Sequence, residues 1–296
     1  MIAAPNKKIG WFDVISYFML AVFCFSVLLP FWDMLLLSIS DPKKTASLAL
    51  RLWPKSFSLD AYEFAFSYNK VPLAYLVTIG RTVCGTALTL LLVTLAAYPL
   101  SKRELPFRNY FTSYFLIPMF FGGGLIPTYL IIRKLGLIDS LLVYILPGAV
   151  GLFYVLLVRN FFMTLEKEIE DAAFIDGAGH IRILFSIIAP LSKPVLATIA
   201  LWAMVGHWNA WFDALIYIRD ADKLTLQAIL QQLLSQASST IPTDTQNFNT
   251  LNPDKYVTGK SFQAALTIIT IGPIVLVYPF FQKYFVQGIM IGSIKG

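Results

Sequence analysis

The stretch EKEIEDAAFIDGAGHIRILFSIIAPLSKP, residues 166–194, is charged and interrupted by glycine in a chain that is otherwise mostly apolar. Its first part predicts a helix over 165–176, because small and apolar side chains recur there three or four residues apart. Thr164 is the expected N-cap. Gly177 is the expected stop, because glycine readily takes the left-handed conformation of a C-terminal cap. A second helical segment follows over 181–189, so the stretch predicts two short helices that meet at a glycine corner between membrane spans.

The residues of this corner allow two uses. A short helix pair with alanines on one face can dock into a groove of another protein, since small side chains permit a close backbone approach. The pair can instead lie on lipid headgroups as an amphipathic connector. Helices at membrane surfaces are usually basic, and this one is acidic, which favours docking. The acidic residues are Glu166, Glu168, Glu170, Asp171 and Asp176.

The composition is that of an integral membrane protein. Of the 296 residues, 57% are hydrophobic and only 14% are charged, and the mean hydropathy is +0.68, whereas about a quarter of the residues in soluble domains are charged. The net charge of +6 is scattered along the chain, which suits an anionic membrane surface better than nucleic acid. We therefore expect membrane lipid, and no nucleic acid, among its partners.

Apolar runs long enough to cross a bilayer predict six membrane spans, which would place both ends of the chain on the same side. Pro118, the triplet Gly122–Gly124 and Pro127 should kink or unwind the third span. Charge does not orient the spans, because eleven of the 23 Lys and Arg residues fall on each side and Arg81 lies within a span. The predicted spans are 14–37, 73–99, 109–132, 140–160, 194–218 and 262–285.

The longest polar stretch covers residues 219–261. Apolar side chains at helical spacing over 223–236 predict an amphipathic helix. The segment 240–256, rich in Asn, Thr and Pro, is either a solvated loop or, as loops of this length often are, a functional one.

We find no catalytic, nucleotide or metal site in the sequence. DKYVTGKS at 254–261 ends like a phosphate-binding loop, but Asp254 stands where its first glycine must be. His180 and His207 are too few and too far apart for a metal cluster. We therefore expect no catalytic residue, no metal site, no cofactor and no enzymatic activity in this chain.

Polar groups at membrane depth are costly and usually face a cavity. The run HWNAWFDALIYI at 207–218 places amide and carboxylate groups beside flat aromatic faces, the combination that sugar binding generally uses. Replacing Asn209 and Asp213 with Ala should then lower uptake without lowering assembly. Alternatively, the tryptophans form an interfacial aromatic belt, and Asp33 and Arg81 neutralise each other rather than line a pathway. The pathway candidates are His207, Trp208, Asn209, Trp211 and Asp213.

DAAFIDGA followed by IIAPLSKP resembles the EAA loop of binding-protein-dependent ABC importers. The pattern of that loop is Glu-Ala-Ala, with a glycine, an isoleucine and a proline at fixed distances. Asp171 and Ala189 replace a Glu and a Leu of the pattern, and both keep the chemical type. The positions that match are Ala172, Ala173, Gly177, Ile187 and Pro190.

The likeness covers residues 10–296 and is to sugar-importer permeases of the maltose type, more narrowly their LplC/YtcP-like branch, which is associated with complex or uronate-containing oligosaccharides. GGGLIPTYLIIRKLGLIDS, GHWNAWFDALIYI and GIMIGSIKG also carry it. The resemblance implies an all-α polytopic protein of the bacterial cytoplasmic membrane, with six transmembrane helices, a cytosolic EAA coupling helix and both termini in the cytoplasm. Its parts would be 1–72 with the first span and an exterior connector, 73–285 as the permease core including the EAA loop 164–194, and 286–296 as a cytosolic tail.

The resemblance also implies a set of partners. These are a second homologous permease, two cytosolic ATPase subunits that bind ATP and Mg, and an extracytoplasmic solute-binding protein. In maltose-type importers the loop corresponding to 240–256 reaches the binding protein, and the tail, here Gly292–Gly296, touches the ATPases. The residues that would couple to the ATPases are Glu170, Asp171, Ala172, Ala173, Asp176, Gly177 and Ala178.

Three other functions are considered. An ABC importer of amino acids or peptides shares the EAA corner, but the tail and the 207–218 run favour sugars. A self-contained secondary transporter would need inverted repeats, and no repeat is seen. An intramembrane enzyme would need a catalytic pair within a span, and none stands out.

Overall fold

The computed structural model describes residues 10–41, 43, 53, 56–67, 70–236 and 256–293, with the backbone alone at 278 and 280–293. Within these ranges the chain is helical and forms no strand, and an isolated antiparallel bridge joins Ser40 and Phe57. The chain divides into two compact units. The first consists of Met1–Tyr68 with Leu233–Ile271, and the second of Asn69–Gln232 with Gly272–Gly296. The segment 240–256, apart from Tyr256, and the last three residues of the tail lie outside the described residues.

The first unit contains the apolar helix α1 (Trp11–Ser38), the short helix α3 (Asp60–Ser67) and the beginning of α15 (Gly259–Ser293). The Ser38 and Tyr62 hydroxyls share a hydrogen bond of 2.8 Å, which ties the end of α1 to α3. Phe64 of α3 packs edge-on against Phe262 of α15, with ring centroids 4.8 Å apart. A polar contact therefore ties α1 to α3, and an aromatic contact ties α3 to α15.

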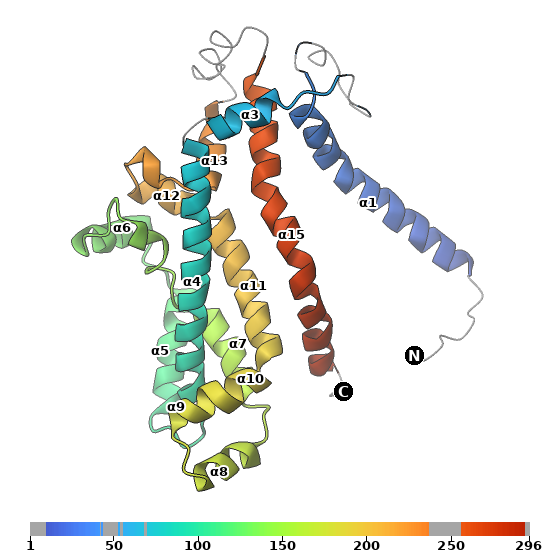
Figure 1. The fold of residues 1–296 in the computed structure, drawn as a ribbon. Coiled ribbons are helices and arrows are strands. Elements are labelled where there is room, and N and C mark those ends of the chain that lie inside the picture. Colours follow the sequence, from blue (N-terminus) through green and yellow to red (C-terminus); the bar gives the residue numbers. More distant parts are fainter. Residues whose placement is uncertain are drawn as a thin grey trace. The chain divides into compact units, whose positions relative to one another are not determined.

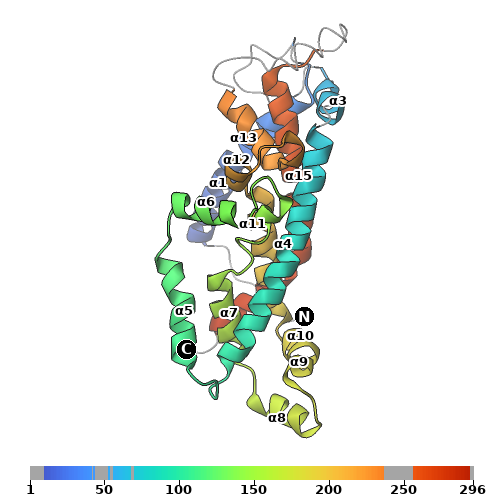
Figure 2. The same ribbon diagram turned by 90° about the vertical axis from the view of Figure 1, so that its left-hand side faces the viewer.

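The second unit is organised around α4 (Lys70–Ser101), which runs along α11 in both views (Figure 1, Figure 2). Both views also place α8 beyond the end of α4 that carries Ser101. The other elements are α5 (Arg108–Phe120), α6 (Leu125–Lys134), the 3-10 helix η1 (Leu141–Tyr144), α7 (Leu152–Phe162), α8 (Lys167–Ile175), α9 (His180–Ile183), the π-helical segment η2 (Leu184–Ile188), α10 (Ala189–Leu191), α11 (Lys193–Asn209), α12 (Phe212–Tyr217), the 3-10 helix η3 (Ala221–Lys223) and α13 (Leu226–Gln236), whose last residues belong to the first unit.

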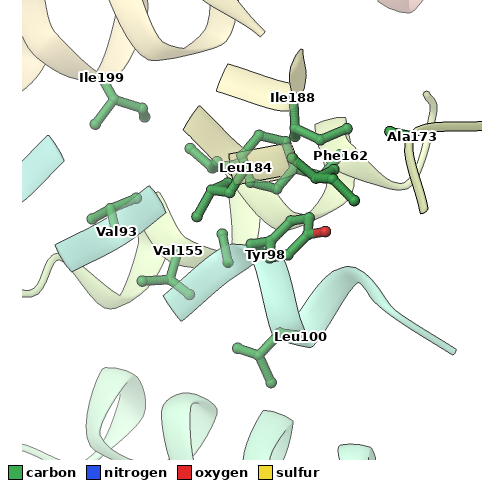
Figure 3. Packing of buried hydrophobic residues seen from close by; sticks show 12 residues of the cluster. Val93, Tyr98, Leu100, Val155, Phe162, Ala173, Leu184, Ile188 and Ile199 are labelled. Atoms are coloured by element: carbon green, nitrogen blue, oxygen red, sulfur yellow. The ribbon is translucent and has the colours of Figure 1, made fainter. Parts of the chain in front are cut away.

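A buried apolar core joins α4, α7, the π-helical segment and α11 near the Ser101 end of α4. Figure 3 shows Phe162, Leu184 and Ile188 crowded together beside the ring of Tyr98. Ala173 of α8 belongs to the same cluster. The short helix α8 is therefore attached to the body of this unit by packing as well as by the chain itself.

The predicted weakness of the third span is confirmed. Its two halves, α5 and α6, meet at 114° across a break at residues 121–124, where Gly124 takes a left-handed φ of 83°. A comparable bend of 84° separates the helices of His180–Leu191 from α11. Glycine and proline at these positions release backbone groups from the helical hydrogen-bond ladder, and such breaks need protein or water to satisfy them.

Some of the other predicted spans are continuous helices, and others are interrupted. Within the described part of the chain, α1, α4 and the Gly259–Val277 part of α15 are long and apolar enough to cross a membrane. Counting each of the two bent pairs as one span raises the candidates there from three to five. The expected continuous run 140–160 is wrong as one helix, because residues 145–151, with Pro147 and Gly148, separate η1 from the 11-residue α7. The run 194–218 is likewise interrupted, at Ala210 and Trp211, between α11 and α12.

The glycine corner is formed as predicted, and its turn has a definite geometry. Gly177 has a φ of 78°, and its N–H donates to the Phe174 carbonyl at 3.0 Å. The next N–H, of Ala178, donates to the Ala173 carbonyl at 3.0 Å. This pair of bonds is the Schellman motif, which satisfies the last carbonyls of α8.

The start of α8 differs from the prediction. The N-cap residue is Glu166, without a capping side-chain bond, whereas Thr164 donates its hydroxyl to the Phe161 carbonyl at 2.7 Å. The expectation that Thr164 caps the helix is therefore wrong, because a threonine hydroxyl can bond a carbonyl of the preceding turn instead. The predicted amphipathic helix over 223–236 is confirmed as α13, although it begins later, at Leu226.

Candidate functional site

Helix α8 presents two different faces. Glu170 and Ala173, three residues apart, are its buried side chains and point toward the body of the unit. Asp171, Ala172 and Asp176 are exposed, and the side chain of Ile175 is 87% exposed. Large apolar side chains beside acidic ones on an exposed helix face suit contact with another protein. The outer face of α8, defined by Asp171, Ala172, Ile175 and Asp176, is therefore a candidate docking surface.

Behind α8 lies a cavity of about 960 Å³, between the helix, the Ser101 end of α4 and α9. Its wall is mixed: Tyr98 and Lys102 line it from α4 and the following turn, and Glu170 and Phe174 line it from α8. His180, at the start of α9, completes the wall. The two histidines of the chain lie in different places: His180 lies at this corner, and His207 lies near the end of α11.

An exposed ion pair also connects α8 to the turn after α4. Lys167 Nζ donates to Glu104 Oε1 at 2.6 Å, with the two side chains 68% and 64% exposed. The hydrogen bond from Lys167 lowers the pKa of Glu104, and the same bond raises the pKa of Lys167. Pairs this exposed are screened by water and contribute little to stability.

A second polar cluster lies where α4 meets the break between α11 and α12. Arg81 is 5% exposed, and both of its terminal nitrogens donate to the Asp213 carboxylate. Its Nη1 also donates to the Ala210 carbonyl at 3.1 Å. The guanidinium carbon lies 4.7 Å from the centroid of the Tyr144 ring, a cation–π distance. The sequence offered Asp33 as the partner of Arg81, but the structure gives that place to Asp213.

The remaining pathway candidates lie in different surroundings. His207 is half-buried against α4, and Trp208 is buried and packs edge-on against Tyr75, with centroids 5.9 Å apart. Asn209 is exposed, and its Oδ1 accepts a hydrogen bond of 3.2 Å from the Gln227 side chain of α13. Trp211 is half-buried and packs edge-on against the exposed Phe212. An exposed amide, that of Asn209, and an exposed aromatic ring, that of Phe212, thus flank the break between α11 and α12.

Sequence reasoning missed several residues that complete these clusters. Tyr98 and Lys102 belong to the corner and Tyr144 to the Arg81 cluster. The basic residue at the end of the second span and the acidic corner were both visible in the sequence, and their opposite charges could have suggested contact. Tyr144 gave no such signal, because a tyrosine in an apolar run reads as an ordinary core residue.

The contact between α4 and α11 leaves no room for a side chain at Gly85. A Cβ placed there would lie 2.5 Å from His207 Nε2 and 2.6 Å from Cε1. We expect Gly85→Ala to lower the free energy of unfolding by about 1–3 kcal/mol, the usual cost of overpacking. The thermal unfolding midpoint of the purified protein in detergent measures it.

Gly80 provides the matched control for that substitution. It lies in the same helix, and nothing is within 4 Å of a Cβ placed there. Gly80→Ala should keep or slightly raise the midpoint, since alanine favours the helix more than glycine does. Equal midpoints for the two variants would mean that His207 does not cover Gly85.

These features define a class of protein. Its long apolar helices, exposed over much of their length, are those of an integral membrane protein. Among the described residues no group of His, Cys, Asp and Glu could hold a metal ion. The acidic corner is exposed on this helical body, where its outer face is a candidate docking surface.

Comparison with known proteins places the chain within that class. Residues 1–291 match the family model described as "Binding-protein-dependent transport system inner membrane component". The chain therefore belongs to this family and is an ABC transporter permease. It is 38% identical to Protein LplC of Bacillus subtilis (strain 168) over 98% of this chain and 97% of that one. It is 37% identical to the polygalacturonan/rhamnogalacturonan transport system permease protein YtcP of the same organism, over 96% of this chain and 98% of that one.

A solved structure is similar along almost the whole chain. It is the crystal structure of a bacterial ABC transporter involved in the import of the acidic polysaccharide alginate. The TM-score is 0.88 at 29% sequence identity, and the match covers 95% of this chain and 100% of that chain. The resemblance stated from the EAA corner is confirmed by all three comparisons.

Proposed function

We propose that this chain is the permease subunit of an ABC importer that moves a sugar or oligosaccharide across the bacterial cytoplasmic membrane, driven by separate ATPase subunits. The observation that carries the proposal is the exposed outer face of α8, a short helix that ends in the Schellman turn at Gly177. A short rigid helix with small and acidic side chains fits a groove on another protein. Membership in a family of transport systems supports that use of the surface.

The coupling role follows from this face. ATP binding would close the pair of ATPases and carry α8 with it as a lever, and the spans would then swing from inward-facing to outward-facing. The ATPases bind the ATP and Mg, and this chain supplies the lever alone. The residues proposed for coupling are Glu170, Asp171, Ala172, Ala173, Asp176, Gly177 and Ala178.

The proposed assembly contains a second homologous permease, two ATPases and an extracytoplasmic solute-binding protein. Six spans with both termini in the cytoplasm would put α8 on the side of the ATPases. The segment 240–256 would then lie outside the cell, where it is the candidate contact for the binding protein. The tail 286–296 would lie on the ATPase side.

Uronate-containing oligosaccharides are the proposed substrate class. YtcP is named for polygalacturonan and rhamnogalacturonan, and the similar solved transporter imports an acidic polysaccharide. These relatives favour a sugar over an amino acid or a peptide. His207, Trp208, Asn209, Trp211 and Asp213 remain the proposed pathway residues. Asn209 has the most direct support, because its amide is exposed.

Uptake by the purified complex tests the proposal. The complex is reconstituted in vesicles with its binding protein and ATP, and uptake of short galacturonate oligosaccharides is measured with and without competing peptides or amino acids. We expect uptake that depends on ATP and is not competed by peptides or amino acids. Purification of this chain without an ATPase subunit, or uptake of peptides in place of sugars, would contradict the proposal.

Asn209→Ala is expected to lower uptake two- to tenfold, roughly the worth of one hydrogen bond to a neutral partner, while the amount of assembled complex stays unchanged. The exposed position of Asn209 near the end of α11 makes the change mild for folding. Asn160→Ala, an exposed asparagine on α7, serves as the control. Equal uptake by wild type and Asn209→Ala would remove Asn209 from the pathway.

A further inference from the structure

One acidic residue of the corner points back into its own subunit. Glu170 is 9% exposed, and both of its carboxylate oxygens accept hydrogen bonds from Lys102 Nζ. The Tyr98 hydroxyl donates to Glu170 Oε2 at 3.3 Å. Lys102 Nζ also lies 4.3 Å from the centroid of the Tyr98 ring. We call these three side chains, Tyr98, Lys102 and Glu170, the clamp.

Aromatic contacts extend the clamp to α9. The Tyr98 ring meets the His180 ring edge-on at 6.4 Å between centroids, and His180 meets Phe174 of α8 at 4.9 Å. Ala173, one turn along from Glu170, is packed into the core below. The end of α4, the helix α8 and the start of α9 are thus joined by an ion pair, three rings and one small apolar contact.

Glu170 is occupied in a way that its acidic neighbours are not. Its two oxygens already accept from a cation and a hydroxyl, and the side chain is buried. Asp171 and Asp176 are exposed on the other face of the same helix. Of the seven residues expected to couple to the ATPase, Glu170 and Ala173 are therefore buried and Ala178 is half-buried. The other four are exposed: Asp171, Ala172, Asp176 and Gly177.

We propose that Tyr98, Lys102 and Glu170 are positioning residues that fix α8 to the end of α4, so that a displacement of the outer face of α8 moves α4 with it. This inference rests on the proposed coupling function of α8. Without the clamp, α8 remains joined to α7 through residues 163–166 and to α9 through the glycine corner. It also keeps the small contact of Ala173 with the core and the exposed Lys167–Glu104 pair. Those short connections allow it to tilt on its own, and a tilt would absorb the motion that coupling requires.

The chain offers a matched ion pair for comparison. Lys167 and Glu104 also connect α8 to the turn after α4, but both are largely exposed. Lys102 and Glu170 are far less exposed, at 26% and 11% of their side chains. An exposed pair breaks and re-forms in water with little effect on position, whereas the loss of one partner of a buried pair leaves the other without compensation. Only the Lys102–Glu170 pair should therefore transmit motion.

The coupling role of the clamp is tested by the number of ATP molecules hydrolysed per sugar transported. The measurement uses the complete importer with its binding protein and galacturonate oligosaccharides. Glu170→Gln keeps the shape of the side chain and removes its charge, and Lys102→Met breaks the pair from the other side if the first variant assembles poorly. We expect at least about a fivefold rise in ATP per sugar, the low end of coupling between distant sites. Lys102→Arg should keep the wild-type ratio, and so should Lys167→Met.

The outcomes separate the clamp from the function on which it rests. A raised ratio in Glu170→Gln and Lys102→Met alone supports the clamp. If uptake and hydrolysis fall in proportion, or if Lys167→Met raises the ratio equally, the clamp is only structural and the inference is wrong. If the wild-type complex itself does not link ATP hydrolysis to uptake, the proposed function fails, and the role of the clamp fails with it.

Discussion

Asp213→Ala is expected to destabilise the protein by about 3–5 kcal/mol, because it leaves the buried charge of Arg81 without its partner. The Arg81 guanidinium would stay buried beside the Ala210 carbonyl and the Tyr144 ring. Neither group carries a charge that could replace the carboxylate. We therefore expect little assembled complex in membranes of the variant, and a lower unfolding midpoint in any that is purified. Both quantities are measured on detergent extracts at equal expression.

A paired substitution distinguishes lost charge from lost shape. Arg81→Met combined with Asp213→Leu replaces the pair by apolar side chains of similar size, which is often neutral for stability. We expect this double variant to recover most of the assembled complex. Normal assembly of the single variant Asp213→Ala would show that the pair is not needed. This expectation differs from the one based on sequence, in which Asp213→Ala lowers uptake alone.

Gly177→Val is expected to leave the importer inserted in the membrane and to uncouple ATP hydrolysis from uptake. Gly177 has a φ of 78°, and nothing lies within 4 Å of a Cβ placed there, so the cost is backbone strain and not a clash. A left-handed conformation costs roughly 1–2 kcal/mol for a residue with a side chain, which corresponds to a factor of about 5–30 in the population of the native turn. The measurement is sugar uptake and ATP hydrolysis in the same vesicles.

Two other substitutions isolate the backbone effect at the corner. Gly179→Val adds the same side chain two residues on, where φ is −78° and space is open, so it should leave coupling intact. Gly177→Asn should retain much of the coupling, because asparagine tolerates the left-handed region. Wild-type uptake by Gly177→Val would refute the lever role of α8.

The parts of the fold that follow from local sequence were predictable. The stop of α8 at Gly177 depends on one residue and its left-handed φ, and the break at 121–124 depends on consecutive glycines. The amphipathic spacing of α13 also lies within a single segment. In each case the physical cause and its effect lie within a few residues, so the sequence contains both.

The parts that depend on long-range contact were not predictable. Asp213 meets Arg81 across 132 positions, and Glu170 meets Lys102 across 68. Most of these residues stand out in the sequence as polar groups beside or within apolar runs, but the sequence does not show which of them are in contact. Asp33 was therefore considered as a partner of Arg81. Hydropathy likewise could not show that residues 145–151 leave the helix, because Pro147 and Gly148 also occur inside membrane helices.

The ion pair between Arg81 and Asp213 has a consequence for biosynthesis. The ribosome makes Arg81 well before Asp213, and 132 positions separate them in the chain. A lone arginine at the centre of a membrane helix costs about 2.5–3.5 kcal/mol on the scale derived from translocon insertion. Until its counter-ion is synthesised, the apolar length of α4 must offset that cost alone.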